Sequence, residues 1–303
     1  MINLNVPYTY EAMEKHINNL KNLYKFIEVG SIGESVLGKK LYYIRLGKGP
    51  NKVLYNGSHH GIEWITTPVL MRFMDEFLEN YSNKYPMKGY DLNEVWTNSS
   101  IYIVPMVNPD GVNLVLNGLN KGNPYYEQLI KWNNGSKDFS KTWKANIRGV
   151  DLNRNYPALW EKSKEKEKST GVYGPGPARY SGKYPLSEPE SRALVNFTRK
   201  VNPNLTLAYH SQGRVIYWNF QNLASERDKV IGQALAKESS YYLDIASGSA
   251  YYGGYKDWFI FEFRRPGYTI EVGKGKNPLP ISQFNTIYNN NVSILLLSSV
   301  ITR

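Results

Sequence analysis

The sequence predicts an α/β fold in which helices cover both faces of a mostly parallel or mixed sheet. Apolar runs of strand length alternate along the chain with longer segments in which apolar residues recur every three to four positions. No internal repeat or linker divides the chain, and 303 residues is within the range of one α/β domain. We therefore expect a single domain over residues 1–303.

The first half of the chain is expected to form two helices and three strands. Apolar residues at helical spacing predict helices over residues 11–27 and from about residue 65 onward. Runs rich in β-branched, aromatic and other apolar residues predict strands at "LYYIRLG" (41–47), "KVLYNG" (52–57) and "SSIYIVPMV" (99–107).

The second half is expected to add three helices and two strands. Ser187 and Glu190 have the spacing of a capping box, which predicts that a helix begins at Ser187. "NLTLAYH" (204–210) and "GYTIEVG" (267–273) are expected to be strands. Helical periodicity returns in residues 223–241 and in the last twenty residues of the chain.

Two stretches lie outside this alternation. The mixed-charge run "EKSKEKEKS" (161–169) is expected to be a solvated loop. Residues 108–157 are rich in Asn, Gly and Lys and show little periodicity, and they end in the specific sequence "RGVDLNRNYP". Long irregular segments inside a compact domain are often functional, so this segment is expected to form a wall of a site.

The composition excludes several kinds of site. The chain has no cysteine, so disulfides, thiolate ligands and cysteine nucleophiles are excluded, and any metal must bind His, Asp or Glu. The net charge of +11 favours an anionic partner or substrate, such as nucleic acid, an anionic wall polymer or an acidic peptide.

The sequence shows no targeting segment. No apolar run of about 18 residues occurs, and the N-terminus lacks a basic start followed by an apolar block. We therefore expect a cytoplasmic protein without a membrane partner. Attachment to the cell wall, or secretion by another route, is the alternative.

The few histidines point to one candidate site. The chain has four, of which His16 lies among polar residues of the first predicted helix and is expected at the surface. His59, His60 and His210 lie at the ends of predicted strands, where α/β sheets form ligand sites. Glu63 is one helical turn beyond His60, so the two side chains and His210 could form a catalytic zinc set with an open position for water. Spacing alone also fits a polar turn with satisfied hydrogen bonds.

Four ordered motifs resemble one enzyme family over about residues 10–300. "GSHHGIEW", "GVDLNRNYP", "LAYHSQG" and "GGYKDWFIFEFRRPGYTIEVG" follow one another as in zinc carboxypeptidases of the carboxypeptidase A and T type. "WKANIRGVDLNRNYP" and "GGYKDWFI" are most similar to the bacterial branch that includes γ-D-glutamyl-diaminopimelate peptidases. The resemblance implies a mixed, twisted, eight-stranded sheet and a metallopeptidase that binds one Zn²⁺ per chain.

The resemblance also implies the metal site and its support. His60, Glu63 and His210 match the zinc ligands of the family. Asp151 matches the carboxylate that hydrogen-bonds the far nitrogen of the first histidine, and such a bond selects the tautomer and orients the ring. Capping of a turn by Asp151 is the alternative.

The catalytic groups follow from the same match. Glu271 lies 13 residues after Trp258, as the general base of the family does, and a carboxylate inside the apolar strand "YTIEV" needs a functional reason. Glu262 is a rival that falls short of the matching spacing. The family places an arginine against the developing oxyanion, and here Lys144 and Arg148 both qualify; Arg148 is favoured.

The residues implied for substrate binding are cationic or amide side chains. Asn153 and Arg154 match the pair that grips a substrate carboxylate, a task that suits the planar guanidinium. Lys256 matches the floor of the specificity pocket and would favour an acidic side chain such as that of diaminopimelate or glutamate. A pair with Asp257, or exposure to solvent, is the alternative for Lys256.

Two positions depart from the family pattern. Ile62 stands where some relatives have an arginine, so one carboxylate contact is missing. The mobile tyrosine of the animal enzymes has no clear counterpart: strict spacing gives Ser249, and Tyr251 and Tyr252 lie nearby. Tyr252 is therefore only a candidate for substrate binding, with plain packing as the alternative.

The predicted function is hydrolysis of an amide bond next to a free carboxylate. The preferred substrates are peptidoglycan peptides, with cleavage of the γ-D-glutamyl-diaminopimelate bond. The first alternative is a general metallocarboxypeptidase acting on the C-termini of peptides. The second is an N-acyl amino acid deacylase of the aspartoacylase type, because "HHGIE" and "DLNR" suit that family as well. A non-catalytic module that binds nucleic acid or wall polymer is disfavoured by the complete set of ligand and base positions. The expected partner is thus a peptide or muropeptide, and not nucleic acid.

Overall fold

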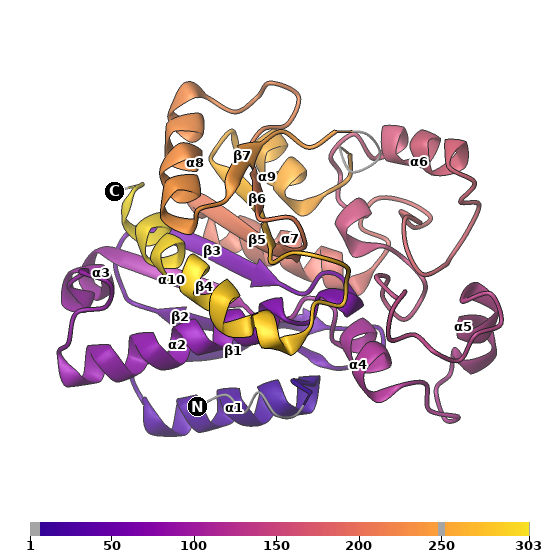
Figure 1. The fold of residues 1–303 in the computed structure, drawn as a ribbon, viewed down its shortest axis with the longest axis horizontal. Helices are drawn as coiled ribbons and strands as arrows, with labels where there is room; N and C mark the ends of the chain where they lie inside the picture. Colours follow the sequence, from indigo (N-terminus) through magenta and orange to yellow (C-terminus); the bar gives the residue numbers. More distant parts are fainter. Residues whose placement is uncertain (1–6, 248–251, 303) are drawn as a thin grey trace.

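The computed structural model describes residues 7–247 and 252–302 (Figure 1). Its strands are β1 (Glu28–Glu34), β2 (Lys40–Leu46), β3 (Asn51–Gly57), β4 (Ser99–Val104), β5 (Leu205–Ser211), β6 (Val215–Tyr217), β7 (Tyr242–Asp244) and β8 (Gly267–Val272). Its helices are α1 (Tyr10–Leu23), α2 (Thr66–Asn83), α3 (Leu92–Asn98), α4 (Pro109–Asn117), α5 (Tyr126–Trp132), α6 (Trp160–Ser169), α7 (Pro189–Val201), α8 (Glu226–Ser239), α9 (Tyr255–Phe263) and α10 (Phe284–Val300). Short 3₁₀ turns are η1 (Gly61–Glu63), η2 (Leu152–Arg154) and η4 (Ile281–Gln283).

The eight strands form one mixed sheet in the order β1-β2-β4-β3-β5-β8-β6-β7. At its centre β4, β3, β5 and β8 run parallel, and β2 and β6 flank them in the antiparallel direction. The prediction of a mixed eight-stranded sheet is confirmed. Because the carboxyl ends of parallel strands meet at one edge, residues that end β3, β5 and β8 come together there.

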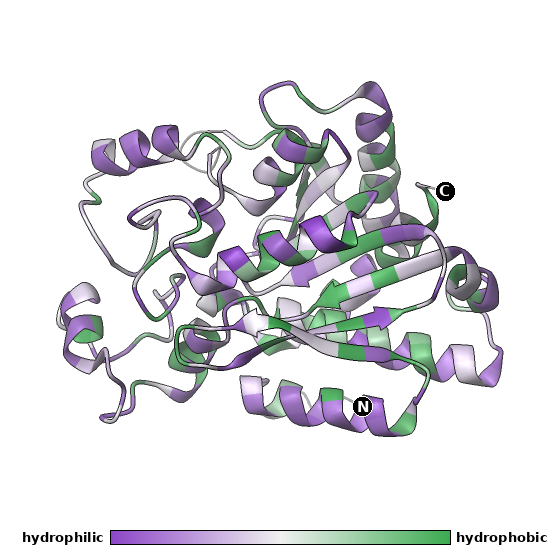
Figure 2. Ribbon diagram, turned by 180° about the vertical axis from the view of Figure 1, so that it is seen from behind, coloured by the Kyte–Doolittle hydropathy of each residue, from purple (hydrophilic) through white to green (hydrophobic). Residues whose placement is uncertain are grey.

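Helices cover both faces of the sheet, as predicted. The alternation of strand side chains sends Val53 and Tyr55 of β3 into a core with α1, α2, α3, α8 and α10, and sends Leu54 into a core with α7 and α9. Figure 2, seen from behind, shows apolar residues along the central strands. Within the described ranges, no helix has both the length and the apolar composition needed to cross a membrane.

The mixed-charge run 161–169 is helical, so its prediction as a loop is wrong. It forms most of α6, and its Glu167 is 3% exposed. The Oε2 atom of Glu167 accepts hydrogen bonds from the backbone N–H of Ser181 at 2.7 Å and from the Ser181 hydroxyl at 2.6 Å. A tertiary contact that the charge pattern does not reveal therefore fastens this segment to the following loop.

His16 is not a free surface residue, contrary to expectation. Its Nε2 lies 2.6 Å from Oδ1 of Asp75, and its Nδ1 lies 2.8 Å from the hydroxyl of Tyr8. The side chain thus joins α1 to α2 and stands apart from the other three histidines.

The predicted capping box at Ser187 does not form. Helix α7 has Glu188 as its N-cap without a side-chain capping bond, and Glu190 instead accepts the backbone N–H of Val36 at 3.1 Å. Burial, together with the nearby carboxylates of Asp110 and Glu188, raises the pKa of Glu190 to about 8. The carboxyl group of Glu190 is therefore a buried link between α7 and the loop that follows β1.

The unfolding free energy of the Glu190→Gln variant is expected to increase relative to that of wild type as pH rises, because wild type loses stability. Because the folded pKa lies above the unfolded pKa, the unfolded state loses its proton first, and wild type loses stability from about pH 4.5 to about pH 8. The difference in unfolding free energy should grow by up to about 1.4 kcal/mol per pH unit in that interval. Urea unfolding of both proteins at pH 5, 6, 7 and 8 checks this, and a difference independent of pH would contradict it.

Candidate active site

Three side chains meet at the carboxyl edge of the sheet. His60 follows β3, Glu63 ends the η1 turn, and His210 is the penultimate residue of β5. One donor atom from each lies within 4.8 Å of the others, and all three residues are buried. The sequence prediction that these residues converge is therefore confirmed.

The η1 turn is held by backbone contacts that require a glycine. The N–H of Gly61 donates to the carbonyl of Lys144, and the N–H of Ile62 donates to the carbonyl of Trp143, each at 3.1 Å. A Cβ on Gly61 would lie 2.6 Å from the carbonyl oxygen of Gly111. This close approach sets the positions of the residues on either side of Gly61.

The polar atoms of the cluster suit a divalent cation. Nδ1 of His60 lies 2.9 Å from Oε1 of Glu63, and Nδ1 of His210 lies 2.9 Å from Oε2 of Glu63. Nε2 of His60 lies 3.1 Å from Oδ1 of Asp151. When Nε2 of His60 carries the ring proton and donates it to Asp151, Nδ1 keeps a lone pair for a metal. Nδ1 is buried and forms no well-oriented hydrogen bond. Two imidazoles and one carboxylate are a typical catalytic zinc set, so these residues fit the metal.

The charges around the cluster keep its two acids ionised. Burial opposes ionisation of Glu63, but the charges of His60 and Lys144 bring its pKa well below the usual value. Burial likewise opposes ionisation of Asp151, and His60 and Arg154 lower its pKa all the same. Both carboxylates are thus available, one as a ligand and the other as the acceptor of the histidine proton.

Glu271 stands beside the ligands on the neighbouring strand. It is the penultimate residue of β8, is paired in register with His210, and lines the same pocket as His60 and Glu63. Loss of solvent around the carboxyl group, and then the charge of Glu63, raise the pKa of Glu271 to about 8. The rival Glu262 lies on the exposed side of α9 and pairs with Arg199 at 2.6 Å.

Lys144, and not Arg148, is the cation beside the ligand set. Nζ of Lys144 lies 2.9 Å from Oε1 of Glu63 inside the pocket. Arg148 points away, with 43% of its side chain exposed, and contacts the hydroxyl of Tyr125 at 3.2 Å and a carboxylate oxygen of Glu188 at 3.8 Å. The preference for Arg148 at the oxyanion therefore has no support in the geometry. The resemblance to the family fits both cations and Arg148 was favoured, because the two lie four residues apart in a segment without periodicity.

The main pocket has a cavity volume of about 360 Å³, and Asn153 and Arg154 line it together with His60 and Glu63. The side-chain oxygen of Asn153 accepts the backbone N–H of Tyr255 at 3.0 Å, which ties η2 to α9. Nε of Arg154 lies 3.5 Å from Oδ2 of Asp151. Both predicted carboxylate-binding residues are therefore in the pocket wall, near the metal set.

A smaller pocket of about 60 Å³ adjoins the first and contains Lys256. Asn153 and Glu271 line both pockets. Nζ of Lys256 lies 2.6 Å from Oδ1 of Asp257 and donates to the carbonyl of Asn219 at 2.8 Å, so the pair foreseen as the alternative for Lys256 is present. The lysine nevertheless lines the pocket next to the predicted general base.

The candidate tyrosines are only partly described. Tyr252 is half-buried and packs against the core that holds α7 and α9, and Nζ of Lys162 lies 5.8 Å from the centroid of its ring. Ser249 and Tyr251 lie outside the described residues. A role of Tyr252 in substrate binding stays a prediction.

Several contacts around the site were not foreseen. His59 is fully buried and lies 2.9 Å from the Tyr156 hydroxyl, so it supports the site without joining the ligands. The backbone N–H of Ser211 donates to Oε2 of Glu63 at 3.2 Å, and Nδ2 of Asn277 donates to Oε1 at 3.4 Å. Arg179 lines the main pocket. No periodicity or motif signals these contacts, because each joins segments far apart in sequence.

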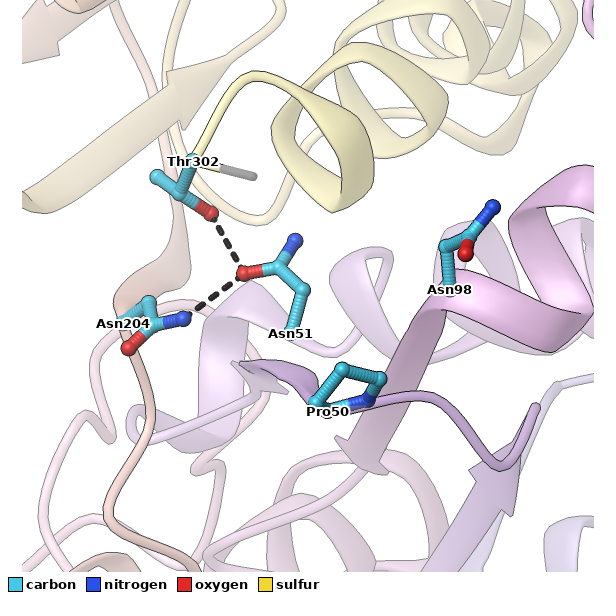
Figure 3. A pocket seen from close by; sticks show the side chains of 5 residues that line it. All are labelled: Pro50, Asn51, Asn98, Asn204 and Thr302. Carbon is cyan, nitrogen blue, oxygen red and sulfur yellow. Dashed lines mark hydrogen bonds between the residues drawn. The ribbon is translucent and has the colours of Figure 1, made fainter.

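A further pocket of about 350 Å³ lies near the amino ends of β3 and β5, whereas the ligand cluster lies at their carboxyl ends. Figure 3 shows the side chains that line it. Pro50, Asn51, Asn98, Asn204 and Thr302 line it. The side-chain oxygen of Asn51 accepts bonds from Nδ2 of Asn204 at 2.8 Å and from the hydroxyl of Thr302 at 2.9 Å. None of the described residues that line this pocket is ionisable, so they offer no general base and no acidic or histidine metal ligand.

Comparisons with known proteins agree with this geometry. The model of a family described as zinc carboxypeptidase matches residues 13–293. A gamma-D-glutamyl-L-diamino acid endopeptidase of Lysinibacillus sphaericus is 42% identical over 98% of this chain and 73% of its own length. The uncharacterized protein YqgT of Bacillus subtilis is 37% identical over 95% of this chain and 76% of its own. Carboxypeptidase A of Helicoverpa armigera shares the fold, with a TM-score of 0.73 at 17% identity over 99% of this chain and 74% of that one.

Proposed function

Because this chain belongs to the zinc carboxypeptidase family, and is therefore a zinc metallopeptidase, we propose that it cleaves γ-D-glutamyl-diamino acid bonds in peptides derived from peptidoglycan. The observation that carries the proposal is the cluster of His60, Glu63 and His210, of which His60 and Glu63 line a pocket whose walls also hold cationic side chains. A relative that is 42% identical over 98% of the chain is named for this bond specificity, which supports the choice of substrate.

The residues of the site have separate roles in the proposed hydrolysis. His60, Glu63 and His210 would hold the zinc ion, which would act as a Lewis acid and lower the pKa of water. Glu271 accepts the proton that the water loses as it attacks the amide carbon, and it donates that proton to the leaving nitrogen when the C–N bond breaks. Lys144 faces the carbonyl oxygen, which gains negative charge as the water attacks. Asn153 and Arg154 hold the free carboxylate of the leaving residue and so place the bond over Glu271.

The smaller pocket suits the side chain of the leaving residue. The side chain of Lys256 is 4% exposed, and Lys256 lines this pocket together with Glu271 and Asn153. Diaminopimelate ends in a carboxylate, which could bind this ammonium group in place of part of its contact with Asp257. An apolar side chain would gain no such contact, so the pocket favours an acidic leaving residue.

The double variant Lys256→Met, Asp257→Asn tests this specificity without leaving a buried charge unpaired. We expect kcat/KM to fall about tenfold or more for a diaminopimelate leaving residue, because one charge-assisted hydrogen bond is lost. For a substrate with a leucine leaving residue the change should stay within about threefold. Equal losses on the two substrates would show that Lys256 has only a structural role.

A substrate panel with zinc occupancy measured in parallel tests the proposed function. It contains a γ-D-glutamyl-diaminopimelate peptide, a simple L-dipeptide and an N-acetylated amino acid. We expect one zinc per chain and the highest kcat/KM on the γ-D-glutamyl peptide. Cleavage of the L-dipeptide alone would indicate a general carboxypeptidase, and cleavage of the acetylated amino acid alone would indicate a deacylase; either result rejects the proposal.

We also propose that the protein is cytoplasmic, that it has no nucleic acid or membrane partner, and that residues 1–303 form one domain. Fractionation of cells that produce the protein checks the first, and binding assays with DNA, RNA and lipid vesicles check the second.

A further inference from the structure

Arg179 is a cation of the main pocket that lacks an acidic partner among the described residues. Lys144 pairs with Glu63 at 2.9 Å, and Arg154 contacts Asp151 at 3.5 Å. Arg179 lines the same pocket, yet its guanidinium takes part in no ion pair within residues 7–247 and 252–302. Its charge is therefore free to meet an anionic group of a ligand.

The backbone holds Arg179 in place. The residue has a φ of 71°, a left-handed conformation that residues with a side chain adopt rarely and that often marks a functional position. Its N–H donates to Oδ2 of Asp151 at 3.0 Å, and the N–H of Asp151 donates to the carbonyl of Tyr180 at 2.8 Å. Since Asp151 also contacts His60, the position of Arg179 is tied to the metal site.

The same wall is joined to the segment that carries the oxyanion cation. The carbonyl of Pro177 accepts the backbone N–H groups of Lys144 and Ala145 at 2.8 and 2.9 Å. Contacts with Lys144 on one side and Asp151 on the other thus fasten residues 177–180. The backbone of Arg179 is thus held in place, and its exposed side chain lines the main pocket, where a ligand group can meet it.

The layout of the two pockets indicates which part of the substrate reaches Arg179. The leaving residue has its carboxylate on Asn153 and Arg154 and its side chain in the smaller pocket with Lys256. Arg179 lines the main pocket, and it is absent from the lining of the smaller one. The acyl part of the substrate, on the other side of the broken bond, therefore lies in the main pocket within reach of Arg179.

We propose that Arg179 binds the free α-carboxylate of the γ-linked D-glutamyl residue, an inference that rests on the proposed function. In an ordinary α-linked peptide, the α-carboxyl group of the acyl residue forms the amide bond that is cleaved, so it carries no free charge. A γ-linked glutamyl residue keeps its α-carboxylate free, a few bonds from the reacting carbon. That extra charge needs one more cation than a simple carboxypeptidase requires, and a planar guanidinium can bind it through two hydrogen bonds.

Two substrates that differ in one group test the assignment. One is γ-D-glutamyl-diaminopimelate, and the other carries an α-carboxamide in place of the α-carboxylate on the glutamyl residue. We expect Arg179→Gln to lower kcat/KM about 10- to 100-fold on the carboxylate substrate, chiefly through a higher KM. On the carboxamide substrate the change should stay within about threefold, and Arg179→Lys should restore part of the loss.

The control is Arg148→Gln, which removes an exposed cation outside the pocket and should leave both substrates unaffected. Equal loss on both substrates, or no loss on either, overturns the assignment of Arg179 while the proposed function stands. If wild type cleaves neither γ-D-glutamyl substrate but does cleave an L-dipeptide, the proposed function fails, and the assignment falls with it. Zinc content should match wild type in every variant, because the contact with Asp151 is made by the backbone of residue 179.

Discussion

Replacement of Glu271 by glutamine is expected to lower kcat by about 10²- to 10⁴-fold, the usual contribution of a general acid–base group. Glutamine has nearly the same shape but cannot take a proton from water or deliver one to the leaving nitrogen. Glu271 lies next to His210 in the register of β5 and β8 and is not one of the three clustered ligands. The variant should therefore keep one zinc per chain and the stability of wild type.

Steady-state kinetics and metal analysis of the Glu271→Gln variant check this prediction. Glu262→Gln is a matched control, because Glu262 was the rival base and lies on the surface in a pair with Arg199. The control should keep activity within about twofold of wild type, as is usual for a surface change. Activity of Glu271→Gln within tenfold of wild type, or a loss of its zinc, would show that Glu271 is not the general base.

Replacement of His210 by alanine is expected to remove both zinc and measurable activity. Metal activation of water contributes several kcal/mol, so kcat should fall by at least about 10³-fold. The variant also removes the imidazole whose Nδ1 lies 2.9 Å from Oε2 of Glu63. The buried charge of Glu63 then has one fewer partner to offset the cost of its burial. A lower melting temperature is expected together with the loss of activity.

Removal of zinc by a chelator gives an independent measure of the same site. Wild type should lose activity with the chelator and regain it when zinc is added, whereas His210→Ala should not respond to zinc. His16→Gln serves as the control, because His16 binds Asp75 and lies outside the cluster. A normal zinc content in His210→Ala would mean that the ion is held elsewhere.

The order of residues along the chain predicted the fold class, and with the family resemblance it also predicted the metal ligands. Alternating strands and helices predicted the α/β sheet, and His60 and His210 each follow or end an apolar strand. Parallel strands bring such ends to one edge, which predicts that the two histidines and Glu63 lie close together, while Glu271 was implied by the resemblance to the family. Periodicity and strand ends are local properties of the chain, and local properties can be read from residue order.

The cations that line the main pocket and the packing of the loops become evident only in the folded structure. It placed Lys144 against Glu63 and turned Arg148 outward, it paired Lys256 with Asp257, and it brought Arg179 into the main pocket. It also folded residues 161–169 into α6. These outcomes depend on side-chain direction in irregular segments and on contacts between residues far apart in sequence. Side-chain direction and long-range contacts leave no periodic pattern in the sequence. Their free energy comes from residues that become neighbours only when the whole chain has folded.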